Sequence, residues 1–304
     1  MVWRVRQPAE RPAAHGLNRV GTLTNGQPAT SLVLQPVDRC VLSPTGFNLT
    51  VPVEYTPAAM ASTLTTAGVR SAPVSSARWQ QRVFFTSMPV AMAVAVFVGF
   101  APTYYLKTAY GTPALTPLYH LHGLLFSLWM ALIVAQPALV AARRISLHRR
   151  LGSVGGVLAA AMVLTALAVA IDLGRRGAAP PGVPPLSFLA VPLATVLVFP
   201  ALIGAALAWR RHPETHKRLM LIGTLELVPA GIARWPGLAA GGPLAYFGIT
   251  DLFLVAMLLF DLATRGRPHP ATLWGGLFLV ASQVLRLVIS STGPWLAFAG
   301  WLVG

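Results

Sequence analysis

The residues that could carry chemistry in this chain are ionisable side chains that interrupt long apolar segments. His120, His122, Asp251 and Arg286 lie inside such segments, and Arg234 lies near the end of another. An ionised side chain costs about 3 kcal/mol at the centre of a hydrocarbon layer, so each must be paired or hydrated. Counted from the expected segment ends, these five groups have similar depth. They predict one outward-facing polar pocket that binds a small ligand, an ion or a lipid headgroup.

Asp251 and Arg286 belong to neighbouring segments, and their matching depth predicts an ion pair. The alternative is that such a pair only specifies how the helices pack. Glu226 lies alone, deep on the inner side, and the sequence shows no partner for it. In a helix the rings of His120 and His122 point about 200° apart, so they share a ligand only if the chain is extended there.

Three further histidines suggest a different chemistry. His148, His212 and His216 lie in two basic connections between apolar segments. They are either anchors at anionic headgroups or ligands of a haem or quinone, which would make the chain a membrane redox protein. No Cys-x-x-Cys or His-Glu-x-x-His motif occurs, so no metal site is predicted and the catalytic residues and cofactor stay unknown.

The apolar segments that must position these residues define the fold class. The 304 residues are 55% hydrophobic and 10% charged, which leaves too little polar surface for a soluble globule of this size. Segments of about 20 apolar residues cross a bilayer as helices. The sequence therefore predicts an all-α, polytopic transmembrane helix bundle of about seven spans, with a short interfacial tail at 295–303. The expected spans are 83–105, 116–141, 151–173, 186–209, 218–235, 244–263 and 273–290.

The basic residues indicate how the bundle is oriented. The net charge of +15 would suggest nucleic-acid binding in a soluble protein, but here lysines and arginines gather in short loops after the second, fourth and sixth spans. Loops rich in Lys and Arg stay in the cytoplasm. We therefore expect a multi-pass protein of the cell inner membrane, with its N-terminus cytoplasmic and its C-terminus outside. Its expected partner is the lipid bilayer and not nucleic acid.

Residues 1–80 contain no apolar run long enough to span a membrane. Their Pro, Ser, Thr and Arg content predicts a disordered tail ahead of a transmembrane domain at 81–304. Alternatively, translation starts near Met60 and the preceding residues are an over-extended gene start. Cys40 is expected to be an inert thiol. Pro137, Pro200 and the Pro-Ala-Gly run at 229–231 predict helix kinks, which would also permit a transporter.

Several short motifs resemble a known group of proteins. They are Phe-Ala-Pro-Thr-Tyr-Tyr at 100–105, Leu-Tyr-His-Leu-His-Gly at 118–123, Leu-His-Arg-Arg-Leu-Gly at 147–152, His-Lys-Arg-Leu-Met at 216–220 and the run at 269–276. Over about 83–304 the chain resembles a family of uncharacterised bacterial inner-membrane proteins with about seven spans. The resemblance implies a helical bundle and a start near Met60, but it carries no activity.

Overall fold

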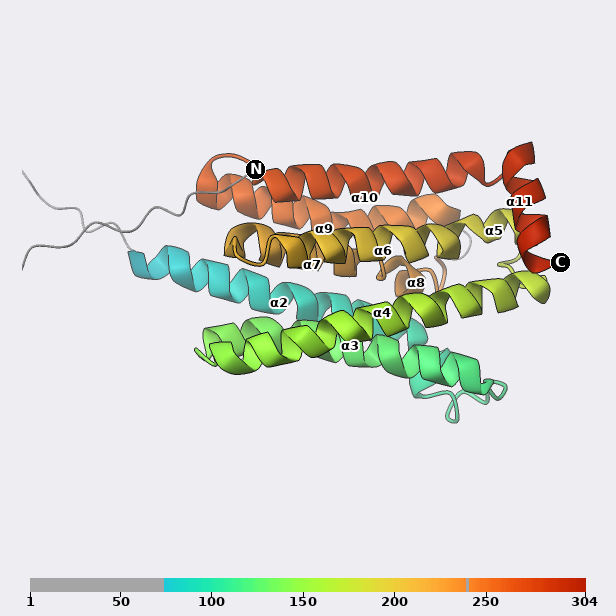
Figure 1. Ribbon diagram of the computed structural model, residues 1–304, viewed down its shortest axis with the longest axis horizontal. Coiled ribbons are helices and arrows are strands. Elements are labelled where there is room, and N and C mark those ends of the chain that lie inside the picture. The colour runs from blue at the N-terminus through green and yellow to red at the C-terminus, as the bar shows by residue number, and fades with distance from the viewer. Residues whose placement is uncertain (1–73, 239–240) are drawn as a thin grey trace, which may run out of the picture. The chain divides into compact units, whose positions relative to one another are not determined.

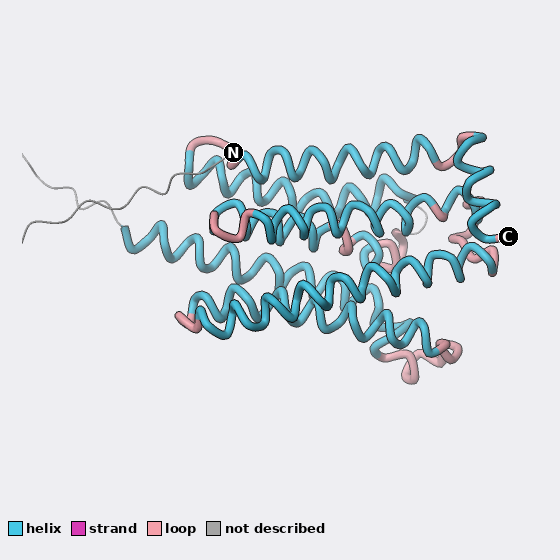
Figure 2. Tube along the Cα trace, viewed as in Figure 1, coloured by secondary structure: helices cyan, strands magenta, loops and turns pink. Residues whose placement is uncertain are grey.

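The computed structural model describes residues 74–238 and 241–304, and within them the chain forms helices and no strands (Figures 1 and 2). Residues 1–73 of the tail predicted at 1–80, together with the start near Met60 and Cys40, lie outside the described residues. Residues 74–80, which the sequence assigned to the tail, begin the first helix. Arg78, Gln80 and Gln81 are good helix formers that a hydropathy pattern alone does not count as part of a span.

Eleven helical elements follow one another in the described part of the chain. They are α2 (Val74–Phe100), the π-helix η1 (Ala101–Tyr105), α3 (Pro117–Ala141), α4 (Ile145–Arg175), α5 (Pro185–Phe188), α6 (Ala190–Ala208), α7 (Pro213–Leu225), α8 (Pro229–Ile232), α9 (Gly242–Arg265), α10 (Pro270–Ile289) and α11 (Gly293–Val303). Within residues 74–238 and 241–304, six helical stretches are long and apolar enough to cross a membrane. The predicted all-α bundle is therefore confirmed.

The fifth predicted span, 218–235, is not one continuous helix. It consists of α7, which has 13 residues, a turn at 226–228 and the four-residue α8. Together α7 and α8 run in the direction opposite to α6 and α9, so the chain passes between the two ends of the bundle about as often as predicted (Figure 1). The short α11 lies across the end of α4 and packs there with α5, as expected for a segment too short to span.

The two ends of the bundle differ in charge. The connections from α3 to α4, from α6 to α7 and from α9 to α10 lie at the same end (Figure 1). We call this the basic end, because it carries the following residues: Arg143, Arg144, Arg149, Arg150, Arg210, Arg211, Arg265 and Arg267. Loops elsewhere in the described chain gather mostly at the opposite end (Figure 2).

The interrupted segment lies at the centre of the bundle. Every residue from Arg218 to Pro229 is buried except Met220, which is half-buried. Trp129 of α3 reaches this segment and donates from Nε1 to the Thr224 hydroxyl at 3.3 Å. Because α7 also packs against α2, α6, α9 and α10, its polar residues Arg218 and Thr224 face protein.

Candidate functional site

The break between α7 and α8 has a cause in the sequence. Pro229 lacks an N–H group and its ring crowds the preceding turn, which weakens a helix at this point, although α3 and α6 continue through Pro137 and Pro200. α7 ends at Leu225. Beyond it, Leu227 N donates to the carbonyl of Thr224, three residues back, at 3.0 Å; this is the spacing of a 3₁₀ turn and not the four-residue spacing of an α-helix. The break places Glu226 in a turn that is buried in the bundle.

Two glycines let α8 approach the backbone of α2. A Cβ atom at Gly99 would lie 2.0 Å from the Gly231 carbonyl oxygen, and one at Gly231 would lie 2.7 Å from the Cα of Val96. Beside them, Trp235 Nε1 donates to the Ala95 carbonyl at 3.0 Å. Irregular backbone at membrane depth must be enclosed by protein, and this glycine contact provides the enclosure on the α2 side.

Glu226 forms a buried ion pair with Arg286 of α10, which we call the central pair. Nη1 of Arg286 lies 2.8 Å from Oε1 of Glu226, and Nη2 donates to Oε2 at 3.1 Å. The Arg286 and Glu226 side chains expose only 2% and 1% of their surfaces. Since α7 has 13 residues, at about 1.5 Å each, Glu226 lies about 20 Å from the basic end.

The sequence predicted that Glu226 lies on the inner side and Arg286 in the outer half of the membrane. This prediction is wrong, because the two side chains form an ion pair and so lie at the same depth. The helix that leads to Glu226 begins at Pro213, whereas the expected span began at 218. Polar residues of its first turns, including Glu214, hid this start from a hydropathy pattern. Glu226 therefore lies farther into the bundle than the sequence indicated and reaches the level of Arg286.

Two hydroxyl groups complete the central pair. Thr195 of α6 donates to Oε1 of Glu226 at 2.8 Å, and the Ser282 hydroxyl accepts from Nη2 of Arg286 at 2.9 Å. Each hydroxyl also lies within bonding distance of an upstream carbonyl of its own helix, at 3.2 Å for Thr195 and 2.6 Å for Ser282. Both hydroxyls would thus keep a partner if the two charges were removed together.

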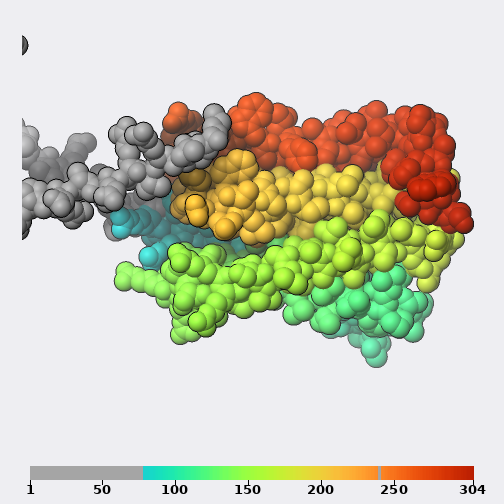
Figure 3. Space-filling model, in the orientation of Figure 1, coloured from blue at the N-terminus to red at the C-terminus, as the bar shows by residue number. Residues whose placement is uncertain are grey.

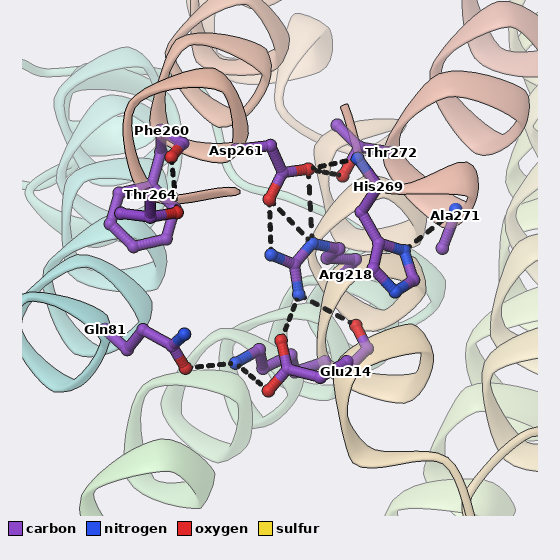
Figure 4. A network of polar contacts seen from close by, with 10 residues as sticks. Gln81, Glu214, Arg218, Phe260, Asp261, Thr264, His269, Ala271 and Thr272 are labelled. Carbon is purple, nitrogen blue, oxygen red and sulfur yellow. Dashed lines mark hydrogen bonds and ion pairs between the residues drawn. The ribbon is translucent and has the colours of Figure 1, made fainter. Parts of the chain in front are cut away.

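A second buried ion pair lies near the basic end (Figure 4). Arg218 and Asp261 side chains are each 1% exposed, and Nε of Arg218 donates to Oδ1 of Asp261 at 3.1 Å. Asp261 also accepts from the Thr272 hydroxyl at 2.6 Å and from the His269 backbone N–H at 3.0 Å. Nη1 of Arg218 donates to Oε2 of Glu214 at 2.6 Å. These five residues, which we call the basic-end cluster, connect α7, α9 and the start of α10.

The imidazole of His269 caps α10 within this cluster. Its Nδ1 accepts from the Ala271 backbone N–H at 3.0 Å, which requires that Nδ1 carry no proton. Burial lowers the pKa of His269 below its ordinary value of 6.5, and the nearby charges of Arg218 and Arg265 lower it further, against the opposing charges of Asp261 and Glu214. The neutral ring that the cap needs is therefore favoured.

The predicted ion pair between Asp251 and Arg286 is wrong. Oδ1 of Asp251 accepts from the Gln283 side-chain amide at 3.0 Å, whereas Arg286 pairs with Glu226. Nε of Arg286 donates to the Ser282 carbonyl at 3.1 Å, so its side chain turns back along α10, as is usual for long side chains in helices. Arg286 thereby faces α6 and α7, about one turn away from the place where Asp251 meets α10.

The other residues of the predicted outward pocket make separate contacts. The His120 carbonyl accepts from the Tyr104 hydroxyl at 3.2 Å, while the exposed Arg234 guanidinium lies 4.3 Å above the Phe100 ring. His122 Nδ1 is 3.4 Å from the Thr165 hydroxyl. Within residues 74–238 and 241–304, no hydrogen bond or ion pair joins any two of His120, His122, Arg234, Asp251 and Arg286. The five residues are therefore not joined by direct bonds, and the outward pocket stays a prediction.

The histidines proposed as haem or quinone ligands lie at the basic end. Nδ1 of His216 is 2.8 Å from the Ala206 carbonyl, which can only accept, so in the neutral ring Nδ1 carries the proton and Nε2 keeps its lone pair. The Gln136 side chain donates to the His148 carbonyl at 3.3 Å. His212 is exposed just before α7 and makes no capping bond.

Sequence reasoning missed several polar groups of the two buried pairs, among them Asp261, Thr195 and Ser282. Asp261 offered a signal, because it is an acidic residue inside the predicted span 244–263. The two hydroxyls offered none, since Ser and Thr occur throughout transmembrane helices without marking a site.

The fold and composition define a multi-pass, α-helical integral membrane protein, and its described residues include two buried ion pairs. Within the described residues, no group of three or more His, Cys, Asp or Glu side chains is arranged to hold a metal ion. Compared with family models, curated proteins and solved structures, the chain matches none. Its function is therefore argued from the geometry of the site.

Proposed function

We propose that this membrane protein binds a small anion together with a proton at the central pair, and that this binding serves transport or sensing of a weak acid. The observation that carries the proposal is a fully buried pair of Glu226 and Arg286 at a break in a transmembrane helix. Ionisable residues at such depth are characteristic of ligand and proton pathways, and broken helices are characteristic of transporter binding sites.

Charge balance explains why the anion and the proton bind together. The empty pair is neutral overall, and an added net charge in a low-dielectric interior is unfavourable. When an anion binds to the Arg286 guanidinium, Glu226 loses its partner and is stabilised by accepting a proton on its carboxylate. The loaded site, with neutral Glu226 and an anion paired to Arg286, again has no net charge.

The surroundings of the pair also favour a role in binding over a role in packing. Replacing a buried ion pair with apolar residues of similar volume is often neutral or stabilising. Here the neighbouring hydroxyls of Thr195 and Ser282 retain bonds to their own helices, so such a replacement would leave no hydroxyl without a partner. We therefore expect the bundle to keep its stability when both charges are replaced together.

Proton uptake during anion binding tests the proposal. Purified full-length protein in weakly buffered detergent solution is titrated with the sodium salts of acetate, lactate and chloride, while a pH indicator reports protons. We expect about one proton to be taken up for each anion bound. Anion binding without proton uptake, or the absence of binding by all three probes, would overturn the proposal.

Two variants provide matched controls. Glu226→Gln keeps the hydrogen-bonding shape but cannot accept the proton, so it is expected to bind anion without proton uptake. The double variant Glu226→Leu with Arg286→Met is expected to fold and to bind no anion. An equal signal from the double variant would mean that the anion binds elsewhere.

The arrangement of basic loops supports a proposed orientation. Because Lys and Arg resist translocation, we propose that the basic end faces the cytoplasm of a bacterial inner-membrane protein, with the carboxyl end outside. Membership of the bacterial seven-span family remains part of this proposal. Labelling of single cysteines introduced at Arg211 and at Val183, in a variant that carries Cys40→Ser, checks the orientation in intact cells, since only the outer position should react with an impermeant reagent.

A redox role is the second candidate, and the orientation of His216 favours it. A ring that donates from Nδ1 to a backbone carbonyl presents Nε2 for ligation, which is the usual arrangement of histidine ligands. His148 or His212 would supply a second ligand to a haem, or a contact to a quinone. A Soret band in protein purified from its native host, lost in His216→Ala, would support this candidate; colourless, iron-free protein would exclude the haem version.

A further inference from the structure

An open apolar groove lies at the basic end between α6, α7 and α10. Its volume is about 510 Å³, within the range of ligand-binding pockets. Ala201 and Ala205 of α6, Leu219 of α7 and Gly275 and Phe278 of α10 are among the residues that line it. Figure 3 shows α6 and α10 on the face in view, and the two helices pack directly against each other. The small residues of α6 leave the space that forms the groove.

The end of the groove is lined by aromatic rings and flanked by positive charge. Trp209 and Trp274 line it and are 51% and 66% exposed. Arg210 and Arg211 follow Trp209 directly and are exposed, and Arg267 lies in the loop that leads into α10. Exposed tryptophans are typical of the headgroup level of a bilayer.

The acidic residues nearby do not neutralise these arginines. The Glu214 carboxylate is already paired with Lys217 at 2.7 Å and with Arg218 at 2.6 Å, and Asp261 is buried against Arg218. The exposed surface at this end of the groove is therefore positive. An apolar groove that ends in a positive surface at headgroup level matches a lipid with a negatively charged headgroup.

We infer that an anionic phospholipid occupies this groove, with an acyl chain against α6 and α10 and its phosphate beside Arg210 and Arg211. The site is separate from the central pair and does not depend on the function proposed for that pair. A bound lipid would hold the α6 to α7 connection against the start of α10, and would make the stability of the bundle depend on lipid composition.

Lipid-dependent stability tests this inference. Full-length protein, stripped of lipid in detergent, is heated with phosphatidylglycerol, with phosphatidylcholine of the same acyl chains, or with inorganic phosphate. We expect phosphatidylglycerol to raise Tm, with phosphatidylcholine and phosphate giving little protection. Equal protection by both lipids would overturn the headgroup assignment, and equal protection by inorganic phosphate would overturn the assignment to a lipid.

Two pairs of variants locate the site. Arg210→Gln with Arg211→Gln is expected to weaken phosphatidylglycerol binding about thirtyfold, whereas Arg149→Gln with Arg150→Gln removes the same charge at the same end and should have little effect. Ala201→Phe fills the groove and should also weaken binding, whereas Ala131→Phe on the exposed face of α3 should not. Equal losses in the control variants would show diffuse attraction and contradict a defined site.

Discussion

The central pair and the basic-end cluster both contain a buried arginine and a buried carboxylate, but they differ in what surrounds them. Arg286 and Glu226 are completed by two hydroxyls that have other partners available. Arg218 and Asp261 are bound by Glu214, by Thr272 and by the backbone N–H of His269. The first pair lies where α7 ends. The second pair joins α7 to α9, and Asp261 also binds the loop before α10 and the first turn of α10.

This difference suggests that the central pair serves binding and that the basic-end cluster stabilises the fold. In the basic-end cluster the Thr272 hydroxyl and the His269 N–H both donate to Asp261, so removing both charges together leaves these two buried donors without their acceptor. At the central pair both charges could be removed together without that penalty. Polar interactions that stability does not need are the ones for which a functional reason should be sought, and this directs the search for function to Glu226 and Arg286.

The largest expected effect comes from breaking the basic-end cluster. Arg218→Met leaves Asp261 as a buried charge with only Thr272 and the His269 N–H as donors, and should lower the free energy of unfolding by about 3–5 kcal/mol. Thermal and denaturant unfolding in detergent measure this loss. The control is Arg176→Met, which breaks an exposed pair with Asp172 and should cost less than about 1 kcal/mol. Equal losses of unfolding free energy in Arg218→Met and Arg176→Met would contradict a structural role for the buried cluster.

Double replacements sharpen the comparison directly. Arg218→Met with Asp261→Leu should remain destabilised by about 2 kcal/mol or more, since the Thr272 hydroxyl and the His269 N–H lose their acceptor. Glu226→Leu with Arg286→Met should lie within about 1 kcal/mol of the unsubstituted protein. If both double variants unfold at the same denaturant concentration, the two pairs do not differ in what they contribute to stability.

Disturbing the contact between Gly99 and Gly231, which encloses the helix break, should lower the free energy of unfolding nearly as much as the double replacement at the basic-end cluster. Gly99→Ala places a Cβ against the Gly231 carbonyl and is expected to cost about 1–3 kcal/mol, because the two backbones must separate. Gly204→Ala is the matched control, since nothing lies within 4 Å of a Cβ there. A neutral Gly99→Ala variant would mean that α8 is not held against α2.

A smaller effect is expected from Asp251→Asn. Asp251 accepts a hydrogen bond from the Gln283 amide, and an asparagine oxygen can accept the same bond. The variant should change the free energy of unfolding by less than about 1 kcal/mol. A loss of several kcal/mol, matched by that of Arg286→Met, would instead support the ion pair that the sequence predicted.

The smallest expected effect is a pH dependence from His269. Because its pKa is lowered in the folded protein, the unfolded chain binds more protons, and stability should fall as the pH drops below the ordinary value of 6.5 toward the lowered folded pKa. His269→Asn keeps a capping side chain and removes the titration. Its Tm should therefore decline less between pH 7 and pH 5, and an unchanged decline would assign the pH dependence to other groups.

The sequence alone determined the class of fold and the approximate positions of the spans. Apolar runs of membrane-spanning length and Lys and Arg in the connecting loops leave few alternatives to a helical bundle. The Pro-Ala-Gly run at 229–231 also predicted the irregularity between α7 and α8. These features were predictable because they depend on local composition and on the intrinsic conformational limits of proline.

Only the tertiary structure decided which charges meet. Asp251 and Arg286 were assigned to each other from depth along the chain, but pairing also depends on which face of each helix is turned inward and on the side-chain direction. Hydropathy could not locate the start of α7 at Pro213, and so it misplaced Glu226. The partners of buried charges follow from the rotation and axial position of several packed helices, which no local pattern in one chain contains.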